Sequence, residues 1–309
     1  RRLSSAASDV YKRQGYYRDQ TFMMSINQLT PDQFFAQLYA HTDIKKDPHS
    51  GGRQMNCHFG TRLLNENGDW KTQTDMMNSV SDISCVSGQM PRIVGLAYAS
   101  KLYRNNKNLS DMENFSINGN EVVFGTIGDA STSEGHFWEA INACGVLQVP
   151  LIMSIWDDGY GISVPSEYHT TRNDLSKALS GFQRSSKKEN GYEIFTVHAW
   201  DYINLLKTYQ KAEKLAREDH VPCIIHVKDV TQPQGHTTSG SHERYKSKER
   251  LNWEKDFCCI KRMREWIIEN NFASNSEIDI IEKNAEEIAK KSRDRSWKSY
   301  RDDIKAVSY

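Results

Sequence analysis

Acidic residues follow two apolar segments that we expect to be strands. Asp129 comes shortly after residues 121–127, and the pair Asp157-Asp158 comes directly after residues 151–156. If these segments are adjacent parallel strands, their terminal carboxylates meet at one edge of the sheet, where open α/β sheets bind ligands. Carboxylate oxygens suit magnesium or calcium better than zinc. The sequence therefore predicts a divalent cation at this edge.

The turn around Asp129 also suits a phosphate group. Gly128-Asp129-Ala130-Ser131 leads into a helix predicted over residues 132–146. Free N–H groups and the helix dipole favour anions at such a helix start. A cation flanked by these amides implies a diphosphate ligand. Taken alone, the same string could be an acidic turn that only caps the helix.

Helices and strands alternate around these turns. Apolar, β-branched runs predict strands over residues 121–127, 151–156, 193–197 and 223–227, with helices over 132–146 and 202–219 between them. Further helices are expected after Thr30-Pro31 and over residues 91–102. Such βαβ units predict an α/β fold, a parallel sheet flanked by helices. Charged helices over residues 253–270 and 276–291 form a C-terminal helical extension.

Composition narrows the class of protein. The 309 residues carry 40 basic and 40 acidic side chains, so no net charge draws the chain to nucleic acid. The longest apolar stretch, residues 149–156, is far shorter than the ~20 residues that span a bilayer. The six cysteines show no CxxC pair and no zinc-type spacing. With no secretory segment visible, we expect a cytoplasmic protein with no nucleic-acid or membrane partner.

A wider string around the two acidic turns is similar to the thiamine diphosphate fingerprint. It reads GDASTSEG over residues 128–135 and DDGYGIS over residues 157–163, with Asn142 between. Four more segments agree in the same order: Tyr17-Arg18-Asp19, GRQMNCHF at 52–59, SGQMP with VGLAYA at 87–99, and GHTTS at 235–239. Together they resemble the alpha-type subunit of the first, decarboxylating component of 2-oxo acid dehydrogenase complexes, over roughly residues 15–251.

The resemblance implies a thiamine-diphosphate-binding fold and a role for each matching residue. Magnesium would be bound by the side chains of Asp129 and Asp158 and by the backbone carbonyl of Tyr160. The cofactor would be bound by these three residues and by Tyr17, Arg18, Gly128, Ala130, Ser131 and Ile162. His58 and His236 would be the catalytic residues that reach toward the 2-oxo acid.

The activity that the resemblance implies is oxidative decarboxylation of a 2-oxo acid, with thiamine diphosphate and magnesium as cofactors. A branched-chain 2-oxo acid is favoured, with pyruvate as the other candidate, and the acyl group passes reductively to a lipoyl acyltransferase partner. In this family the site lies between alpha-type and beta-type halves. We therefore expect activity only with a beta-type half, fused or separate, in a hetero- or homo-oligomer.

Three departures from the family pattern leave other functions open. Ala130 stands where the family has glycine, Asp157-Asp158 where it has two asparagines, and Trp156 where some relatives have arginine. A catalytically silent thiamine-diphosphate-binding or scaffolding subunit is one alternative, and an acetoin-type dehydrogenase is another. A Rossmann dinucleotide binder is disfavoured, because no GxGxxG follows any predicted strand.

The predicted organisation has three parts. Residues 1–14 are expected to be a non-native or disordered lead, because they carry three arginines, a lysine and three serines without a hydrophobic period. Residues 15–251 form the thiamine-diphosphate-binding dehydrogenase domain. Residues 252–309 form the charged helical extension, a possible connector to a beta-type half.

Overall fold

A parallel sheet organises the fold. The computed structural model describes residues 11–236 and 242–307. Six strands pair in the order β2-β1-β3-β4-β8-β7, all in parallel, and a separate hairpin pairs β5 with β6. The strand bounds are β1 Tyr11–Gln14, β2 Asn78–Ser79, β3 Val122–Gly128, β4 Leu151–Trp156, β5 Tyr160–Gly161, β6 Val164–Pro165, β7 Glu193–His198 and β8 Cys223–Lys228.

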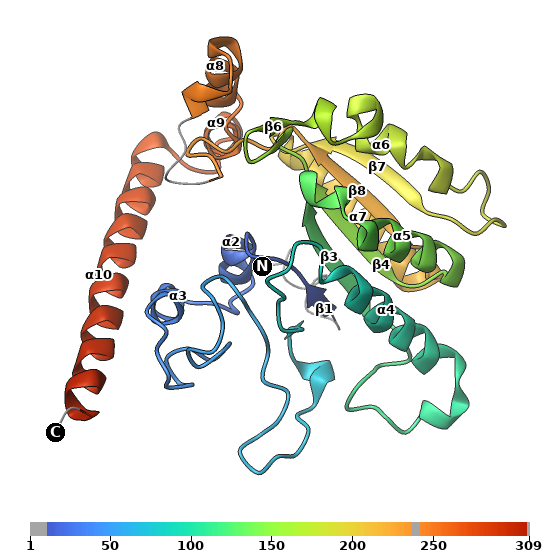
Figure 1. Ribbon diagram of the computed structural model, residues 1–309, viewed down its shortest axis with the longest axis horizontal. Helices are drawn as coiled ribbons and strands as arrows, with labels where there is room; N and C mark the ends of the chain where they lie inside the picture. The colour runs from blue at the N-terminus through green and yellow to red at the C-terminus, as the bar shows by residue number, and fades with distance from the viewer. Residues whose placement is uncertain (1–10, 237–241, 308–309) are drawn as a thin grey trace.

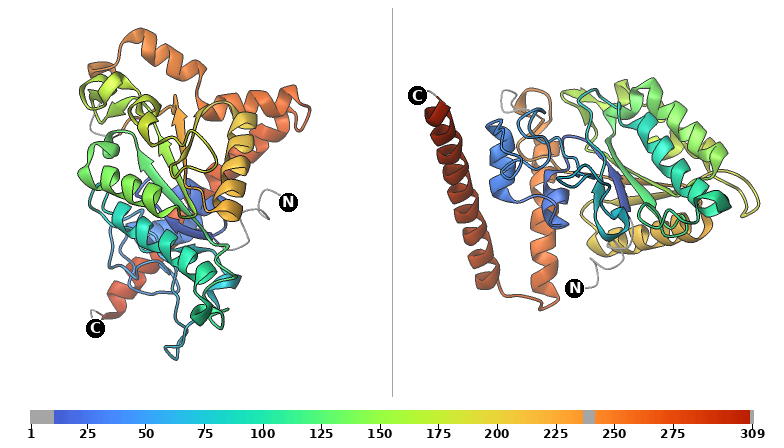
Figure 2. Two further views of the ribbon diagram at one scale, coloured as in Figure 1. Left: turned by 90° about the vertical axis from the view of Figure 1, so that its right-hand side faces the viewer. Right: turned by 90° about the horizontal axis from the view of Figure 1, so that it is seen from below.

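Helices cover both faces of this sheet, as Figures 1 and 2 show. The α-helices are α2 Gln20–Ser25, α3 Pro31–Leu38, α4 Met90–Asn105, α5 Gly135–Leu147, α6 Leu175–Ala178, α7 Tyr202–Asp219, α8 Lys248–Asp256, α9 Cys259–Glu269 and α10 Asn275–Val307. Short 3₁₀ turns are η1 Gln73–Asp75, η2 Lys107–Leu109, η3 Ala130–Ser133, η4 Ser166–Tyr168, η5 Thr171–Asn173, η6 Ser180–Phe182 and η7 His242–Arg244. The predicted fold class, a parallel sheet flanked by helices with a C-terminal helical extension, is confirmed.

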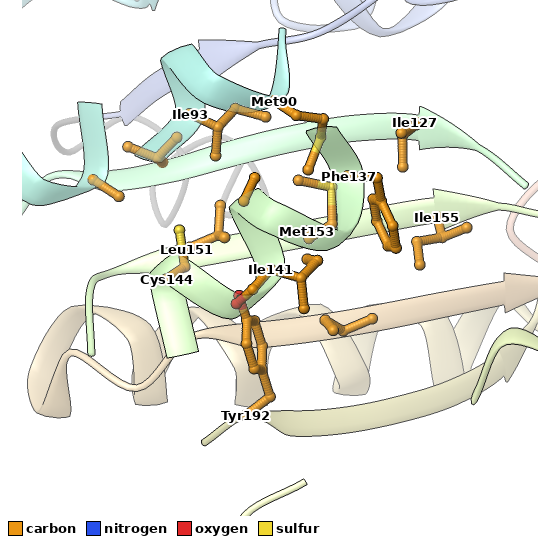
Figure 3. Close-up of a cluster of buried hydrophobic side chains, with 14 of the residues drawn as sticks. Met90, Ile93, Ile127, Phe137, Ile141, Cys144, Leu151, Met153, Ile155 and Tyr192 are labelled. Atoms are coloured by element: carbon orange, nitrogen blue, oxygen red, sulfur yellow. The ribbon is translucent and has the colours of Figure 1, made fainter. Parts of the chain in front are cut away.

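The two faces of the sheet bury different helices because successive strand residues point in opposite directions. On one face, Ile127 of β3 and Met153 of β4 pack with Ile93 of α4 and Ile141 of α5 (Figure 3). On the other face, alternate residues of the same strands pack against α7. These strands therefore carry continuous apolar runs because both of their faces are buried, as expected for parallel strands.

The structure corrects the prediction for residues 1–14 over the part that it describes. Tyr11–Gln14 form β1, which lies between β2 and β3. Pairing on both sides satisfies its backbone groups. Its one fully buried charge, Arg13, lies 2.6 Å from Asp19 and 3.1 Å from Asp82. A polar sequence occupies this strand because its charge is neutralised locally, which no hydrophobic period could reveal.

The helical extension also differs from its prediction. The helix expected over residues 253–270 is two helices, α8 and α9, and α10 continues to Val307 beyond the expected end near residue 291. The predicted boundary between residues 251 and 252 falls inside α8. The long helix α10 packs along α3 (Figure 1), where Asp32 accepts hydrogen bonds from Ser292 and Arg295. The extension therefore returns to the N-terminal part of the chain.

Candidate functional site

The strand register brings the acidic turns together. Gly128 of β3 pairs with Trp156 of β4, so Asp129 and Asp157 leave the sheet at the same edge. Each turn is tied to the next strand: the Asp129 N–H donates to the Trp156 carbonyl (3.2 Å), and the Asp157 N–H donates to the Val227 carbonyl (2.9 Å). The condition for a shared site, that these two strands are neighbours, is therefore met.

At this edge of the sheet, Asp129 and Asp158 each keep a carboxylate oxygen that accepts no hydrogen bond from the described residues. Each residue is only 4% exposed. The Oδ2 atom of each is buried and has no hydrogen-bond partner within the described residues. A buried carboxylate oxygen without a partner is costly, so such a pair fits a cation. This donor set, two hard carboxylate oxygens, suits magnesium.

The electrostatics of these carboxylates agree with a cation site. Burial, with the neighbouring carboxylates of Asp157 and Asp158, raises the pKa of Asp129 to about 9. Burial also raises the pKa of Asp158 to about 6. A charged carboxylate is unfavourable here because it is desolvated and faces like charges. A divalent cation between the two would offset both effects.

Asp157 differs from Asp158 because its oxygens are already engaged. Its Oδ1 accepts from the Gly159 N–H (2.8 Å) and its Oδ2 from His226 Nε2 (2.7 Å). Although burial alone would raise it, the hydrogen bond and charge of His226 hold the pKa of Asp157 below its usual value. His226 is fully buried in β8, and its Nδ1 lies 2.6 Å from Ser176 Oγ. Asp158, rather than Asp157, is thus free to face a metal.

Ala130 fits its turn without strain. It begins η3 and keeps a negative φ, so the glycine of the family pattern is not required for backbone reasons. A Cβ placed on Gly161 would lie only 2.9 Å from the Ala130 Cβ. The hairpin strand β5 therefore approaches this turn closely, and Gly161 provides the room that the Ala130 methyl occupies.

Residues 128–132, here called the diphosphate turn, are fixed by side chains of the 84–87 loop and of the turn itself. Ser87 Oγ donates to the Ser131 carbonyl (2.5 Å), and the Thr132 Oγ1 donates to the Asp129 carbonyl (2.6 Å). The Gly128 Cα faces Tyr16, whose hydroxyl lies 3.9 Å from where a Cβ would be. The backbone N–H groups at the start of η3 thus lie in a turn that side chains fix on both sides.

Tyr160 and Ile162 lie on the loop that follows Asp158. The Tyr160 N–H donates to Asp158 Oδ1 (3.2 Å), which fixes the predicted carbonyl ligand next to the predicted carboxylate ligand. Ile162 has φ +60° and is 61% exposed. A β-branched residue with positive φ is a genuine outlier, and such strain clusters at ligand-binding sites.

Of the predicted phosphate-binding pair, Arg18 lies near the acidic turns. Its charge lowers the pKa of both Asp158 and His236, whereas Tyr17 is 42% exposed and carries Arg18 over its ring at 5.6 Å. The buried neighbour is Tyr16, with its ring 6.0 Å from that of Trp156. Sequence reasoning missed Tyr16. The signal that could have found it is the pair of adjacent tyrosines, because neighbouring side chains point in different directions and only one of the two can be buried.

The two predicted catalytic histidines occupy different environments. His236 Nε2 lies 3.8 Å from Asp158 Oδ2. Burial and the nearby charges of Arg18 and Lys246 lower the pKa of His236 to about 4, so its imidazole is neutral at pH 7. His58 Nδ1 faces the Asn56 carbonyl (3.1 Å) and its Nε2 faces Ser84 Oγ (2.9 Å). His58 therefore carries its proton on Nδ1 and accepts at Nε2.

No described contact joins His58 directly to the acidic turns. The 84–87 loop links them, because Ser84 binds His58 and Ser87 binds the diphosphate turn. The structure also brings in residues that sequence reasoning missed: His169, whose Nε2 lies 3.9 Å from Asp129 Oδ2, and the cations Lys246 and Arg250. These come from loops and helices with no apolar period, so no pattern marked them.

The described residues hold neither a larger metal-binding cluster nor a membrane-spanning helix. No three His, Cys, Asp or Glu side chains within residues 11–236 and 242–307 form a metal-binding group. Over the same residues, no helix has the length and apolarity to cross a bilayer.

Comparison with known proteins gives the family. The family model described as "Dehydrogenase E1 component" matches residues 6–302. A pyruvate dehydrogenase E1 component subunit alpha from Rickettsia bellii (strain RML369-C) is 27% identical over 67% of this chain and 56% of that protein. A mitochondrial 2-oxoisovalerate dehydrogenase subunit alpha from Dictyostelium discoideum is 27% identical over 83% of this chain and 50% of that protein.

The chain spans about half the length of these curated relatives. A solved transketolase from Campylobacter jejuni subsp. jejuni NCTC 11168 is 17% identical, over 48% of this chain and 20% of that chain, with a TM-score of 0.36, which is too slight a likeness to carry an argument. The family match covers nearly all of the sequence, including both acidic turns and the helices after them. The chain therefore belongs to the dehydrogenase E1 component family.

Proposed function

We propose that this chain supplies the diphosphate- and magnesium-binding half of a thiamine-diphosphate-dependent 2-oxo acid dehydrogenase. The main support is the pair of buried Oδ2 atoms of Asp129 and Asp158, which accept no hydrogen bond from the described residues and lie at one edge of the sheet beside the start of η3. The similarity to alpha subunits of pyruvate and 2-oxoisovalerate dehydrogenases supports this class of reaction.

In this proposal the side chains of Asp129 and Asp158 and the carbonyl of Tyr160 hold magnesium. The N–H groups of Gly128, Ala130 and Ser131 and the side chains of Tyr17 and Arg18 hold the diphosphate, and Ile162 adds a further contact with the cofactor. An arginine suits phosphate oxygens because its planar fork donates two parallel hydrogen bonds. Thiamine diphosphate, when bound, supplies the nucleophilic carbon and the electron sink for decarboxylation.

His236 lies where a proton acceptor is needed. Its imidazole is neutral because burial and neighbouring cations lower its pKa to about 4, so at pH 7 it can accept a proton or a hydrogen bond from a partly buried position. His58 accepts at Nε2 from Ser84, so it holds that hydroxyl in one orientation. We assign His236 to proton transfer with the 2-oxo acid and His58 to its orientation.

The finer assignments follow from the family resemblance. The favoured substrate is a branched-chain 2-oxo acid, with pyruvate second, and the acyl acceptor is the lipoyl group of an acyltransferase. Activity requires a beta-type half, which supplies the carboxylate that activates the cofactor. The helical extension would connect to that half if the two are fused.

The test is 2-oxo-acid-dependent reduction of an artificial electron acceptor by the chain combined with its beta-type half. Pyruvate, 2-oxoisovalerate and 2-oxoglutarate are compared, each with and without thiamine diphosphate and magnesium. Turnover that requires both cofactors supports the proposal and identifies the substrate. Tight cofactor binding without turnover of any acid would instead favour a silent cofactor-binding subunit.

The alanine at position 130, one reason to consider a catalytically silent subunit, gives that alternative little support in the structure. Ala130 requires no positive φ, and Gly161 leaves room for its methyl group. The second reason, the Asp157-Asp158 pair, is also reduced, because Asp157 is engaged by His226 and Gly159. Only one extra carboxylate, that of Asp158, then faces the diphosphate, and magnesium would offset its repulsion.

A further inference from the structure

Three charged residues form a stripe just after the loop that carries His236. Lys246, Arg250 and Glu254 are spaced by four residues, and the last two lie on α8, so they share one helical face. Glu254 Oε1 lies 2.7 Å from Lys246 Nζ and 2.9 Å from Arg250 Nε. The side chains of Lys246 and Glu254 are 1% and 3% exposed. One buried carboxylate therefore binds two cations.

Both cations contact the turn that carries the proposed metal ligands. Arg250 Nη2 donates to the Asp158 carbonyl (2.9 Å). Lys246 Nζ lies 4.8 Å from the centre of the Tyr160 ring, and Arg250 Cζ lies 5.6 Å from it. These distances are within the range of cation–π attraction. Lys246 and Arg250 thus contact both proposed ligands, at the backbone of Asp158 and at the ring of Tyr160.

The other contacts of the turn are local. The Gly159 N–H donates to Asp157 Oδ1 (2.8 Å), the Tyr160 N–H donates to Asp158 Oδ1 (3.2 Å), and the Ser166 N–H donates to the Gly159 carbonyl (3.0 Å). Gly159, between the two ligands, has φ +79° and no Cβ, so the backbone there has more freedom than at any other residue type. A metal site depends on ligands that are held before the ion arrives, because loosely held ligands must be ordered on binding.

We propose that Glu254 is a positioning residue for the metal site, which holds Lys246 and Arg250 against the Asp158–Tyr160 turn and so fixes the carboxylate and carbonyl ligands for a divalent cation. This inference rests on the proposed function, because that proposal identifies the ligands. Glu254 itself touches neither ligand. Its removal would leave a buried ammonium without its anion and would free the guanidinium to leave the Asp158 carbonyl.

The test measures binding of Mn²⁺ to the full chain in the presence of inorganic pyrophosphate, followed by the electron paramagnetic resonance signal of free and bound Mn²⁺. For Glu254→Gln we expect about tenfold weaker Mn²⁺ binding and a broader bound signal, which reports a less uniform ligand geometry. Glu254→Asp, which keeps the charge, should restore part of the affinity. Glu249→Gln, on an exposed position of the same helix, is the matched control and should bind as the unaltered chain does.

A second variant guards against misfolding of the first. Arg250 is only partly buried. Its guanidinium donates to both Glu254 and the Asp158 carbonyl, and Arg250→Lys keeps the charge but cannot make both contacts in this geometry. We expect it to weaken Mn²⁺ binding several-fold with circular dichroism unchanged. If the unaltered chain binds Mn²⁺ and both variants bind it equally well, the positioning role is refuted while the proposed function stands. If the unaltered chain binds no Mn²⁺, the metal assignment itself falls and this inference with it.

Discussion

His226 donates from Nε2 to Asp157 Oδ2 across 2.7 Å, from a position in β8 that has no exposure to solvent. This bond separates the roles of two adjacent aspartates. Asp157 is turned toward β8, and Asp158 keeps an unpartnered oxygen at the sheet edge. The two adjacent aspartates thus differ because His226, which lies 69 positions after Asp157, binds only one of them.

The first prediction concerns this bond. His226→Asn shortens the donor side chain and leaves the partly buried Asp157 Oδ2 without the partner that it has in β8. An unsatisfied buried acceptor costs about 1–3 kcal/mol, so we expect the free energy of unfolding in urea to fall by that amount. His198→Asn is the control, because His198 also pairs with an aspartate, Asp229, but at an exposed site where such a pair contributes little. Equal losses for the two variants would contradict the prediction.

A second prediction concerns the charge of Asp158. Asp158→Asn keeps an oxygen at the site but removes the negative charge that a divalent cation would bind. We expect the magnesium concentration needed for half-maximal thiamine diphosphate binding, measured by calorimetry, to rise at least tenfold. Asp111→Asn, at an exposed residue away from the sheet edge, should leave it unchanged. Many-fold tighter cofactor binding by Asp158→Asn would mean that repulsion of the diphosphate outweighs the attraction for magnesium.

A third prediction follows from the close approach of Gly161 to Ala130. Gly161→Ala would place its Cβ 2.9 Å from the Ala130 Cβ, so the hairpin or the η3 turn must shift. Overpacking of this kind costs about 1–3 kcal/mol, and the thermal midpoint should fall accordingly.

The double variant tests whether the cause is this contact. Ala130→Gly combined with Gly161→Ala removes the clash and should recover most of the lost stability. Gly181→Ala, where a Cβ would meet no atom within 4 Å, is the control for adding a methyl group. If the double variant were no more stable than Gly161→Ala alone, the proposed contact would not explain the loss.

A fourth prediction concerns thiol reactivity. Cys85 is exposed, whereas Cys144 and Cys223 are buried, and burial raises the pKa of each of these two thiols to about 12. Only the thiolate reacts, so at pH 8 we expect a disulfide reagent to modify Cys85 first and these two only after unfolding. Peptide mass spectrometry at successive times separates the sites. Modification of Cys144 in the native protein at the rate of Cys85 would overturn this prediction.

The sheet was largely predictable because its strands carry strong local signals. The apolar run that ends at Trp156 matches β4 at both ends, and α7 likewise matches its predicted bounds. The strand β1 was not predictable, since Lys12, Arg13 and Gln14 carry no apolar alternation and the buried charge of Arg13 is neutralised by Asp19 and Asp82. The break between α8 and α9 was missed because the charged sequence there has no proline or glycine to mark it.

The site was predictable only in part, for the same physical reason. Asp129 and Asp158 follow strands, and the parallel arrangement forces such residues together. His226, Lys246 and Glu254 support them from other elements, and their contacts depend on packing that joins residues distant in the chain, such as Arg250 and Asp158, 92 positions apart. Spacing within one segment cannot indicate a partner in another.

The position of Glu254 has a practical consequence for dividing this chain into parts. A fragment that ended at residue 251 would retain every residue predicted to bind cofactor or metal, yet it would end within α8 and lose the anion 2.7 Å from Lys246. Loss of metal binding by such a fragment would then be misread as absence of a site. Domain exchange between relatives should likewise transfer α8 together with the Asp158–Tyr160 turn, because Arg250 of α8 contacts both Asp158 and Tyr160.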